Sequence, residues 1–361
     1  HTRLLTVTGV QTCALPISLE QALVLGQFAK KVNVPFKALM FTSHYAYDQT
    51  PYGYKPESLM PDRSCRLVTL LDTAAPNWAM QEEVVCAAAN AYTARSSERT
   101  CPVPPYFSLG QTPLYSGMLM VEPILDQMKS QYRLDKTTLF ILTDGEDSNN
   151  VAYVDATGQE NARLNRFGAK NRGIIVRDAR TRKTYGRVVE TTQYDYHSGK
   201  DVPALLNTMN AIPEMLVEMI RDRHQTRVML IRLLDRRSLR RMKSATSEVA
   251  DTLTSLLRVP FASNENFARR SEILTAAQLT AIATALTGKD STGQTLVPAS
   301  ATYYDAVLLV NPSTLDLDED DFDDLVTDGM SAKRIASAFT KSNVTAARNK
   351  VFVNAVIPHL I

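Results

Sequence analysis

The stretch "TTLFILTDGEDSNN", Thr137–Asn150, decides the fold of this chain. It opens with a continuous apolar run and ends abruptly in polar residues. Continuous rather than alternating apolarity predicts a strand that is covered on both faces. Asp144 and Glu146 follow the run, and Gly145 between them allows a sharp turn. Carboxylate oxygens on a well-held backbone suit hard cations. A solvated strand-to-helix loop uses the same residue types, so this stretch alone leaves both interpretations open.

The segments around this strand alternate between helix and strand patterns. Apolar runs predict further strands at Phe36–Phe41, in "GIIVRD" (173–178) and in "RVMLIRLLD" (227–235). Helical periodicity covers the stretches 19–32, 80–95, 114–132 and 204–219. "RTRKTYGRVV", 180–189, indicates a short hairpin. The alternation predicts an α/β fold with a mostly parallel, doubly wound sheet flanked by helices. Sheets of this class bind ligands at the carboxyl ends of their strands.

A second polar motif, "GQTPL", precedes one of these helices. Thr112 is predicted to cap the helix, and Pro113 to occupy its first position. The threonine hydroxyl would then lie at a loop-to-helix junction. A simple helix cap and a metal ligand are both compatible with Thr112.

The start of the chain does not resemble natural protein sequence. "VTGVQTCALPI", Val7–Ile17, makes a poor secretion signal because Gly9, Gln11 and Thr12 interrupt its apolar part. It resembles, residue for residue, the translation of a common sequencing-adaptor oligonucleotide. We therefore expect residues 1–18 to be a non-native segment and the chain to be truncated at its N-terminus.

The pair G-x-T-P-L and an apolar strand ending in T-D-G resembles von Willebrand factor type A (VWA) domains. The resemblance implies a metal-ion-dependent adhesion site in which three loops hold Mg²⁺, or Mn²⁺. Thr112 matches the threonine of the second loop and Asp144 the aspartate of the third. Gly110, Gly145, Glu146, Ser148 and Asn149 would form the rim of the site. The D-x-S-x-S motif of the first loop is absent from the sequence, so we expect an incomplete site.

Three further stretches resemble VWA proteins of tailed phages that are related to the cobaltochelatase CobT subunit: "FAKKVNVPFKALMFTS", "VRDARTRKTYGRVV" and "RIASAFTKSNVTAARNKVFVNAVI". In that family the VWA subunit is not itself the enzyme. It acts with an AAA+ ATPase subunit of the CobS/MoxR type, and the metal mediates docking through an acidic partner residue. The resemblance implies a non-catalytic interaction subunit in the host cytoplasm.

The domain organisation follows from the same comparison. We expect a VWA-like α/β domain over residues 19–235 that lacks its first strand. A helical insertion would occupy 236–300, and a C-terminal strand and helices 301–361.

A basic segment supports an alternative function. Residues 221–243 hold eight arginines and one lysine, and Arg236, Arg237, Arg240 and Arg241 are the candidate phosphate contacts of a nucleic-acid-associated phage protein. A solvated, salt-bridged face is the interpretation that we favour, and we expect no nucleic-acid partner. The net charge of +2 gives no global basic bias. No apolar run approaches the ~20 residues of a membrane helix, and the sequence contains none of the common nucleotide-binding or hydrolase motifs.

Overall fold

The structure is a computed structural model. It describes residues 4–9, 15–43, 58–61, 65–96, 112–143, 151–154, 160–161, 173–188, 190–195, 200–205, 208–257, 274–288, 293–298 and 302–312. The helices predicted for the C-terminal stretch lie outside these residues.

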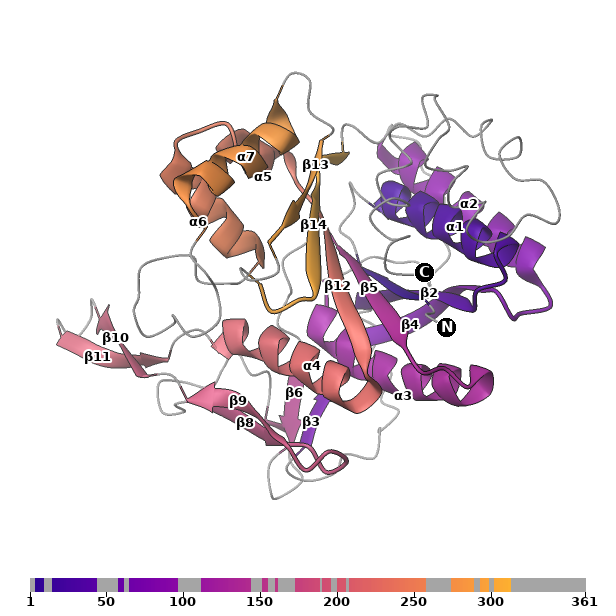
Figure 1. Ribbon diagram of the computed structural model, residues 1–361, viewed down its shortest axis with the longest axis horizontal. Helices are drawn as coiled ribbons and strands as arrows, with labels where there is room; N and C mark the ends of the chain where they lie inside the picture. The colour runs from indigo at the N-terminus through magenta and orange to yellow at the C-terminus, as the bar shows by residue number, and fades with distance from the viewer. Residues whose placement is uncertain are drawn as a thin grey trace.

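A seven-stranded sheet forms the centre of the described structure (Figure 1). Its strands in chain order are β1 (Leu4–Gly9), β2 (Phe36–Ser43), β4 (Cys65–Asp72), β5 (Thr137–Thr143), β12 (Thr226–Leu233), β13 (Gln294–Val297) and β14 (Ala306–Val310). The order across the sheet is β13-β14-β12-β5-β1-β2-β4. The five inner strands are parallel, and the edge strands β4 and β13 are antiparallel to their neighbours. The predicted α/β class is confirmed.

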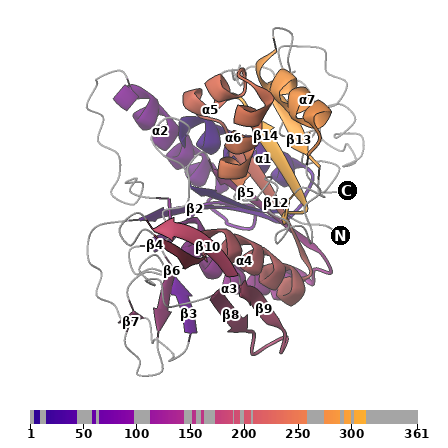
Figure 2. The same cartoon turned by 90° about the vertical axis from the view of Figure 1, so that its left-hand side faces the viewer.

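Helices cover both faces of this sheet (Figure 2). On one face lie α1 (Leu15–Lys31) and α2 (Trp78–Ser96), whose apolar side chains share a core with β2, β4, β5 and β12. On the other lie α3 (Leu114–Tyr132) and α4 (Thr208–His224). The remaining helices, α5 (Arg236–Arg241), α6 (Thr246–Leu257) and α7 (Ala276–Thr287), fall between β12 and β14 in the chain. Each layer removes one face of the sheet from water.

The strand β5 is buried along its whole length because both layers press on it. Leu139 and Ile141 belong to the core under α3 and α4, whereas Phe140 and Leu142 belong to the core under α1 and α2. Successive strand residues point to opposite faces, so the centre of a strand covered on both faces is apolar at consecutive positions, here Leu139–Leu142, and threonines stand at its two ends. The strand predicted from the continuous apolar run is confirmed.

The place of the first strand is filled, contrary to our expectation. We expected the α/β domain to lack this strand, but Leu4–Gly9 forms β1 and pairs in parallel with both β2 and β5. Six backbone partners along β5 run from Leu4↔Thr138 to Gly9↔Thr143. The run Leu4–Thr8 is short and rich in β-branched and apolar residues, which suits an inner strand. The adaptor resemblance of Val7–Ile17 concerns the origin of this segment and stays a prediction.

Two other segments differ from the sequence-based expectation. "GIIVRD" contributes β8 (Gly173–Arg177), which pairs antiparallel with β9 (Thr184–Val188) in a separate hairpin and not in the main sheet. The six-residue connection is too short for the crossover that a parallel pair requires. The stretch 236–300, which we expected to be helical, also contains β13. β14 follows this stretch and pairs with β12. The main sheet therefore includes strands from both sides of the domain boundary that we expected at residue 235.

Two further small groups of strands complete the described elements, beside the β8–β9 hairpin. β3 (Ser58–Pro61), β6 (Val151–Val154) and β7 (Glu160–Asn161) form one small antiparallel sheet, and β10 (Glu190–Asp195) pairs with β11 (Lys200–Leu205).

A buried polar cluster fixes the β8–β9 hairpin to α3 and α4. Asp178, 1% exposed, follows β8 and accepts hydrogen bonds from the Arg180 and Thr181 amides and from the Thr181 hydroxyl. Arg223 of α4 donates to the Asp178 carboxylate at 2.6 Å and also pairs with Glu122 of α3. One guanidinium therefore joins three elements. The Arg223 hydrogen bond holds the pKa of Asp178 well below its usual range.

We predict that Arg223→Met destabilises the protein by about 3 kcal/mol, because it leaves the Asp178 carboxylate buried without its cation. Since the folded-state pKa of Asp178 is lowered, the contribution of this pair is complete above the unfolded-state pKa. It is lost as the pH falls from there through the folded-state pKa. Urea unfolding between pH 5 and pH 2.5 should therefore show a flatter acid decline for Arg223→Met than for the parent protein.

The matched control is Arg180→Met, which removes an ion pair to Asp126 whose side chains are 55% and 48% exposed. Exposed pairs contribute about 0–1 kcal/mol. Equal losses of stability for the two variants would contradict the buried role of Arg223.

Candidate functional site

The carboxyl ends of the inner parallel strands form the candidate site. β1, β5 and β12 end side by side, with Gly9 opposite Thr143 and Thr143 opposite Arg232. From β1 the chain continues through α1 to β2, which lies on one side of β1 in the sheet. β5 lies on the other side of β1 and is followed in the sheet by β12. The direction in which successive strands are added therefore reverses between β1 and β5. In open α/β sheets, ligands bind at this reversal, outside the carboxyl ends.

Thr112 lies at the same end of the sheet, directly before α3. The Cys65 thiol at the start of β4 lies 4.0 Å from the Pro113 carbonyl oxygen. In the first turn of α3, a Cβ on Gly117 would lie 3.2 Å from Phe41, near the carboxyl end of β2. Glycine here lets the helix approach β2 closely. The start of α3 is therefore held against the carboxyl ends of the strands, and Thr112 is 3% exposed.

The predicted capping role of Thr112 is wrong. Pro113 is the N-cap residue of α3, and the helix start has no side-chain cap hydrogen bond. The Thr112 carbonyl oxygen accepts a hydrogen bond from the Leu114 amide at 3.0 Å. The predicted start of the helix was wrong by one residue. With Pro113 at position N1, Thr112 would have been the N-cap residue. The hydroxyl of Thr112 is thus not used to cap the helix.

The other predicted site residues follow described elements in the chain but lie outside the described residues themselves: Gly110, Asp144, Gly145, Glu146, Ser148 and Asn149. Thr143, the residue before Asp144, is the buried last residue of β5. Within the part of the chain that the structure describes, no three histidine, cysteine or acidic side chains gather as a metal site would require.

Arg232 is a site residue that the sequence-based interpretation missed. We expected it on a solvated face, yet it is 4% exposed. Val228 and Leu230 belong to the core under α3 and α4, and alternation along β12 puts Arg232 on that same side. The even spacing of the three residues was the available signal. This buried cation lies on the strand next to Thr143, at the edge where Asp144 follows.

The basic residues of the alternative interpretation lie elsewhere. Arg236, Arg237, Arg240 and Arg241 are all exposed on α5, a helix with no buried residue. Asp235 caps this helix by accepting a hydrogen bond from the Ser238 amide. Among the described residues, no salt bridge is formed by these four arginines, so the expected salt-bridged face is not observed there.

Comparisons with known proteins identify no family. The chain matches no protein-family model and no curated protein. Among solved structures, it is similar to the pilus adhesin SpaC from Lactobacillus rhamnosus GG in its open conformation, with a TM-score of 0.34 and 12% sequence identity. A second form of the same adhesin gives a TM-score of 0.33 at 12% identity. These matches cover 78% of this chain but only 29% and 30% of the adhesin chains. Because the TM-scores lie below 0.5, neither similarity supports an argument about fold or function.

The described helices were also compared with the requirements of a membrane span. Among them, none is both long and apolar enough to cross a bilayer.

We predict that Arg232→Met raises the affinity of the chain for Mg²⁺ by about tenfold, because it removes a desolvated positive charge from the edge where the cation would bind. Isothermal titration calorimetry measures this affinity. The control is Arg227→Met, which removes the same charge from an exposed position on the same strand. If both variants bind Mg²⁺ as the parent does, Arg232 has no electrostatic influence on the site.

Proposed function

We propose that the chain is a VWA-type interaction domain whose cation site lies at the carboxyl ends of β1 and β5. The cation would be Mg²⁺ or Mn²⁺, and its role would be to bind a protein partner and not to catalyse a reaction. The Thr112 hydroxyl and the Asp144 carboxylate would be the ligands from this chain, with Gly110, Gly145, Glu146, Ser148 and Asn149 at the rim.

The strand order is the observation that carries this proposal. When β1, β2, β4, β5, β12 and β14 are counted one to six along the chain, the sheet reads 3-2-1-4-5-6. The same order occurs in doubly wound sheets, whose crevice lies between strands one and four, here β1 and β5, although β4 runs antiparallel in this sheet and β13 adds a seventh strand. Both motifs of the VWA resemblance adjoin this region: T-D-G continues β5, and the G-x-T-P-L threonine precedes α3.

The oxygen donors that this chain offers suit a hard cation that takes only a few of its ligands from the protein. One carboxylate and one hydroxyl supply two oxygens, and Mg²⁺ keeps several waters in such sites. Between β1 and α1 the chain reads "VQTCA", which offers no carboxylate. The site in this chain is therefore incomplete, which suits a cation that takes a further ligand from a partner.

We predict that Asp144→Asn lowers Mg²⁺ affinity by roughly 30-fold or more, because loss of a charged ligand costs about 2 kcal/mol or more. Thr112→Val should lower it by about fivefold, since it removes a neutral ligand worth about 1 kcal/mol. Calorimetric titration with MgCl₂ and MnCl₂ gives both values. Asp147→Asn is the control, because it removes one negative charge from the same loop. Equal weakening by the Asp144 and Asp147 variants would mean that only net charge matters and would reject the ligand assignment.

The partner in this proposal is an AAA+ ATPase subunit of the CobS/MoxR type, as the resemblance to phage CobT-like proteins suggests. An acidic residue of the partner would complete the coordination of the cation. We expect an AAA+ ATPase of the CobS/MoxR type to bind the chain in Mg²⁺ and to lose at least about tenfold in affinity in EDTA or with Asp144→Asn. Fluorescence anisotropy of the labelled ATPase measures this. Binding that is equally tight in EDTA would refute the metal-dependent role while leaving a metal-independent interaction.

A further inference from the structure

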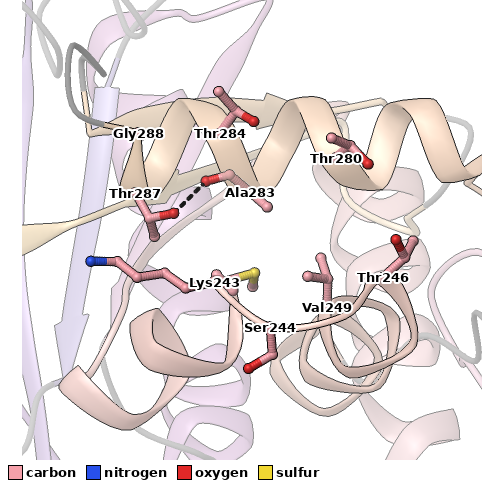
Figure 3. A pocket seen from close by; sticks show the side chains of 10 residues that line it. Lys243, Ser244, Thr246, Val249, Thr280, Ala283, Thr284, Thr287 and Gly288 are labelled. Carbon is pink, nitrogen blue, oxygen red and sulfur yellow. Dashed lines mark hydrogen bonds between the residues drawn. The ribbon is translucent and has the colours of Figure 1, made fainter.

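A pocket lies between α7 and the turn that joins α5 to α6 (Figure 3). Its volume is about 330 Å³, at the lower end of the range for small-molecule sites. Met242 and Val249, each 2% exposed, and Ala283 form its apolar lining. Lys243 lies along the gap below α7, and Thr246 stands at the opposite end (Figure 3). None of these residues belongs to the cation site proposed above.

The charge around this pocket is positive. No carboxylate is among the lining residues. In the segment 235–251, five basic side chains face three acidic ones, Asp235, Glu248 and Asp251. Arg240 and Arg241 lie within one turn of Lys243, whose amide donates to the Arg240 carbonyl oxygen. Among the described residues, no salt bridge is formed by Lys243.

The hydroxyl groups of the lining fall into two sets. Thr280 and Thr287 donate their protons to the carbonyl oxygens of Ala276 and Ala283, at 2.8 Å and 2.9 Å, within α7. The hydroxyls of Ser244, Thr246 and Thr284 make no hydrogen bond to the described part of the chain, and the exposed hydroxyl of Thr246 can donate to a ligand. The Lys243 ammonium carries three more donors. The pocket thus offers a cation and a hydroxyl donor beside an apolar surface.

We propose that this pocket binds the phosphate group of a small organic phosphate. Lys243 would pair with the phosphate at one end of the pocket, and the organic part would lie on Met242, Val249 and Ala283. Thr246, at the opposite end, would donate a hydrogen bond to the far end of the organic part. Charge-assisted hydrogen bonds to phosphate are about twice as strong as neutral ones. The exposed arginines of α5 would raise the local concentration of anions. The same phosphate chemistry occurs in nucleic-acid backbones, and the experiment separates the two sources.

The test uses the full chain and three probes: inorganic phosphate, adenosine 5′-monophosphate and a ten-nucleotide single-stranded oligothymidylate. Lys243→Gln should weaken the binding of phosphate and of the monophosphate about tenfold, as measured by calorimetry. Thr246→Val should weaken the monophosphate about fivefold and leave inorganic phosphate unchanged. Thr280→Val is the control for Thr246, because it removes a hydroxyl of the same pocket whose proton is already committed. Arg237→Gln is the control for charge, because Arg237 is exposed on α5 and does not line the pocket.

The proposal is supported if Thr280→Val binds as the parent does and Arg237→Gln weakens binding far less than Lys243→Gln does. Thr246→Val must in addition weaken the monophosphate. Failure of phosphate and the monophosphate to bind the parent overturns it. Equal weakening by Arg237→Gln and Lys243→Gln also overturns it, since the general charge of α5 would then explain the result. Oligonucleotide binding without monophosphate binding would assign the arginines to a nucleic-acid backbone and would reject the pocket. Thermal unfolding of each variant checks that it is folded.

Discussion

The burial of β5 between two helical layers is the constraint on which the rest of the structure depends. Its seven residues are all buried, and its side chains alternate between the core under α3 and α4 and the core under α1 and α2. β1 and β12 pair with it on either side, so β5 is an inner strand of the sheet. Burial limits the polar residues within the strand to the uncharged threonines at its ends, and the charged residues of this stretch follow Thr143 in the sequence.

That constraint brings separate parts of the chain to one edge. Parallel pairing puts the ends of β1, β5 and β12 in register, so Gly9, Thr143 and Arg232 meet although they are far apart in sequence. The approach of α3 to Phe41, permitted by Gly117, brings the start of that helix to the same edge. On the other side of α3, Arg223 ties the helix to α4 and to the β8–β9 hairpin. The position of Thr112 therefore rests on contacts at the start and in the middle of α3.

The sequence predicted those parts of the fold that a local pattern controls. The continuous apolar run of β5 and the periodicity of α1 to α4 required no knowledge of partners. The predictions were wrong where contacts between residues that are far apart in the sequence determine the structure. "GIIVRD" has the composition of an inner strand, yet its short connection to β9 makes it a hairpin arm. Arg232 looks like a surface residue by type, and only the spacing from Val228 and Leu230 indicates its burial. For the site, the sequence predicted Thr112 and Asp144. The strand β1 was not predicted, because its residues 7–9 belong to the adaptor-like stretch and residues 1–18 were expected to be non-native. A pairing strand needs only a suitable apolar and β-branched pattern, whatever its origin.

The charges at the carboxyl edge explain why a cation in the proposed site would depend on a partner. A divalent cation there would gain one carboxylate from this chain and would be opposed by the buried Arg232. A partner's carboxylate would add the missing negative charge and occupy a coordination position that water fills in the free chain. By thermodynamic linkage, the factor by which the partner raises the affinity for the cation equals the factor by which the cation raises the affinity for the partner. A site with too few ligands is in this sense better suited to switching an interaction than a complete one. A complete site holds its metal whether or not the partner is present.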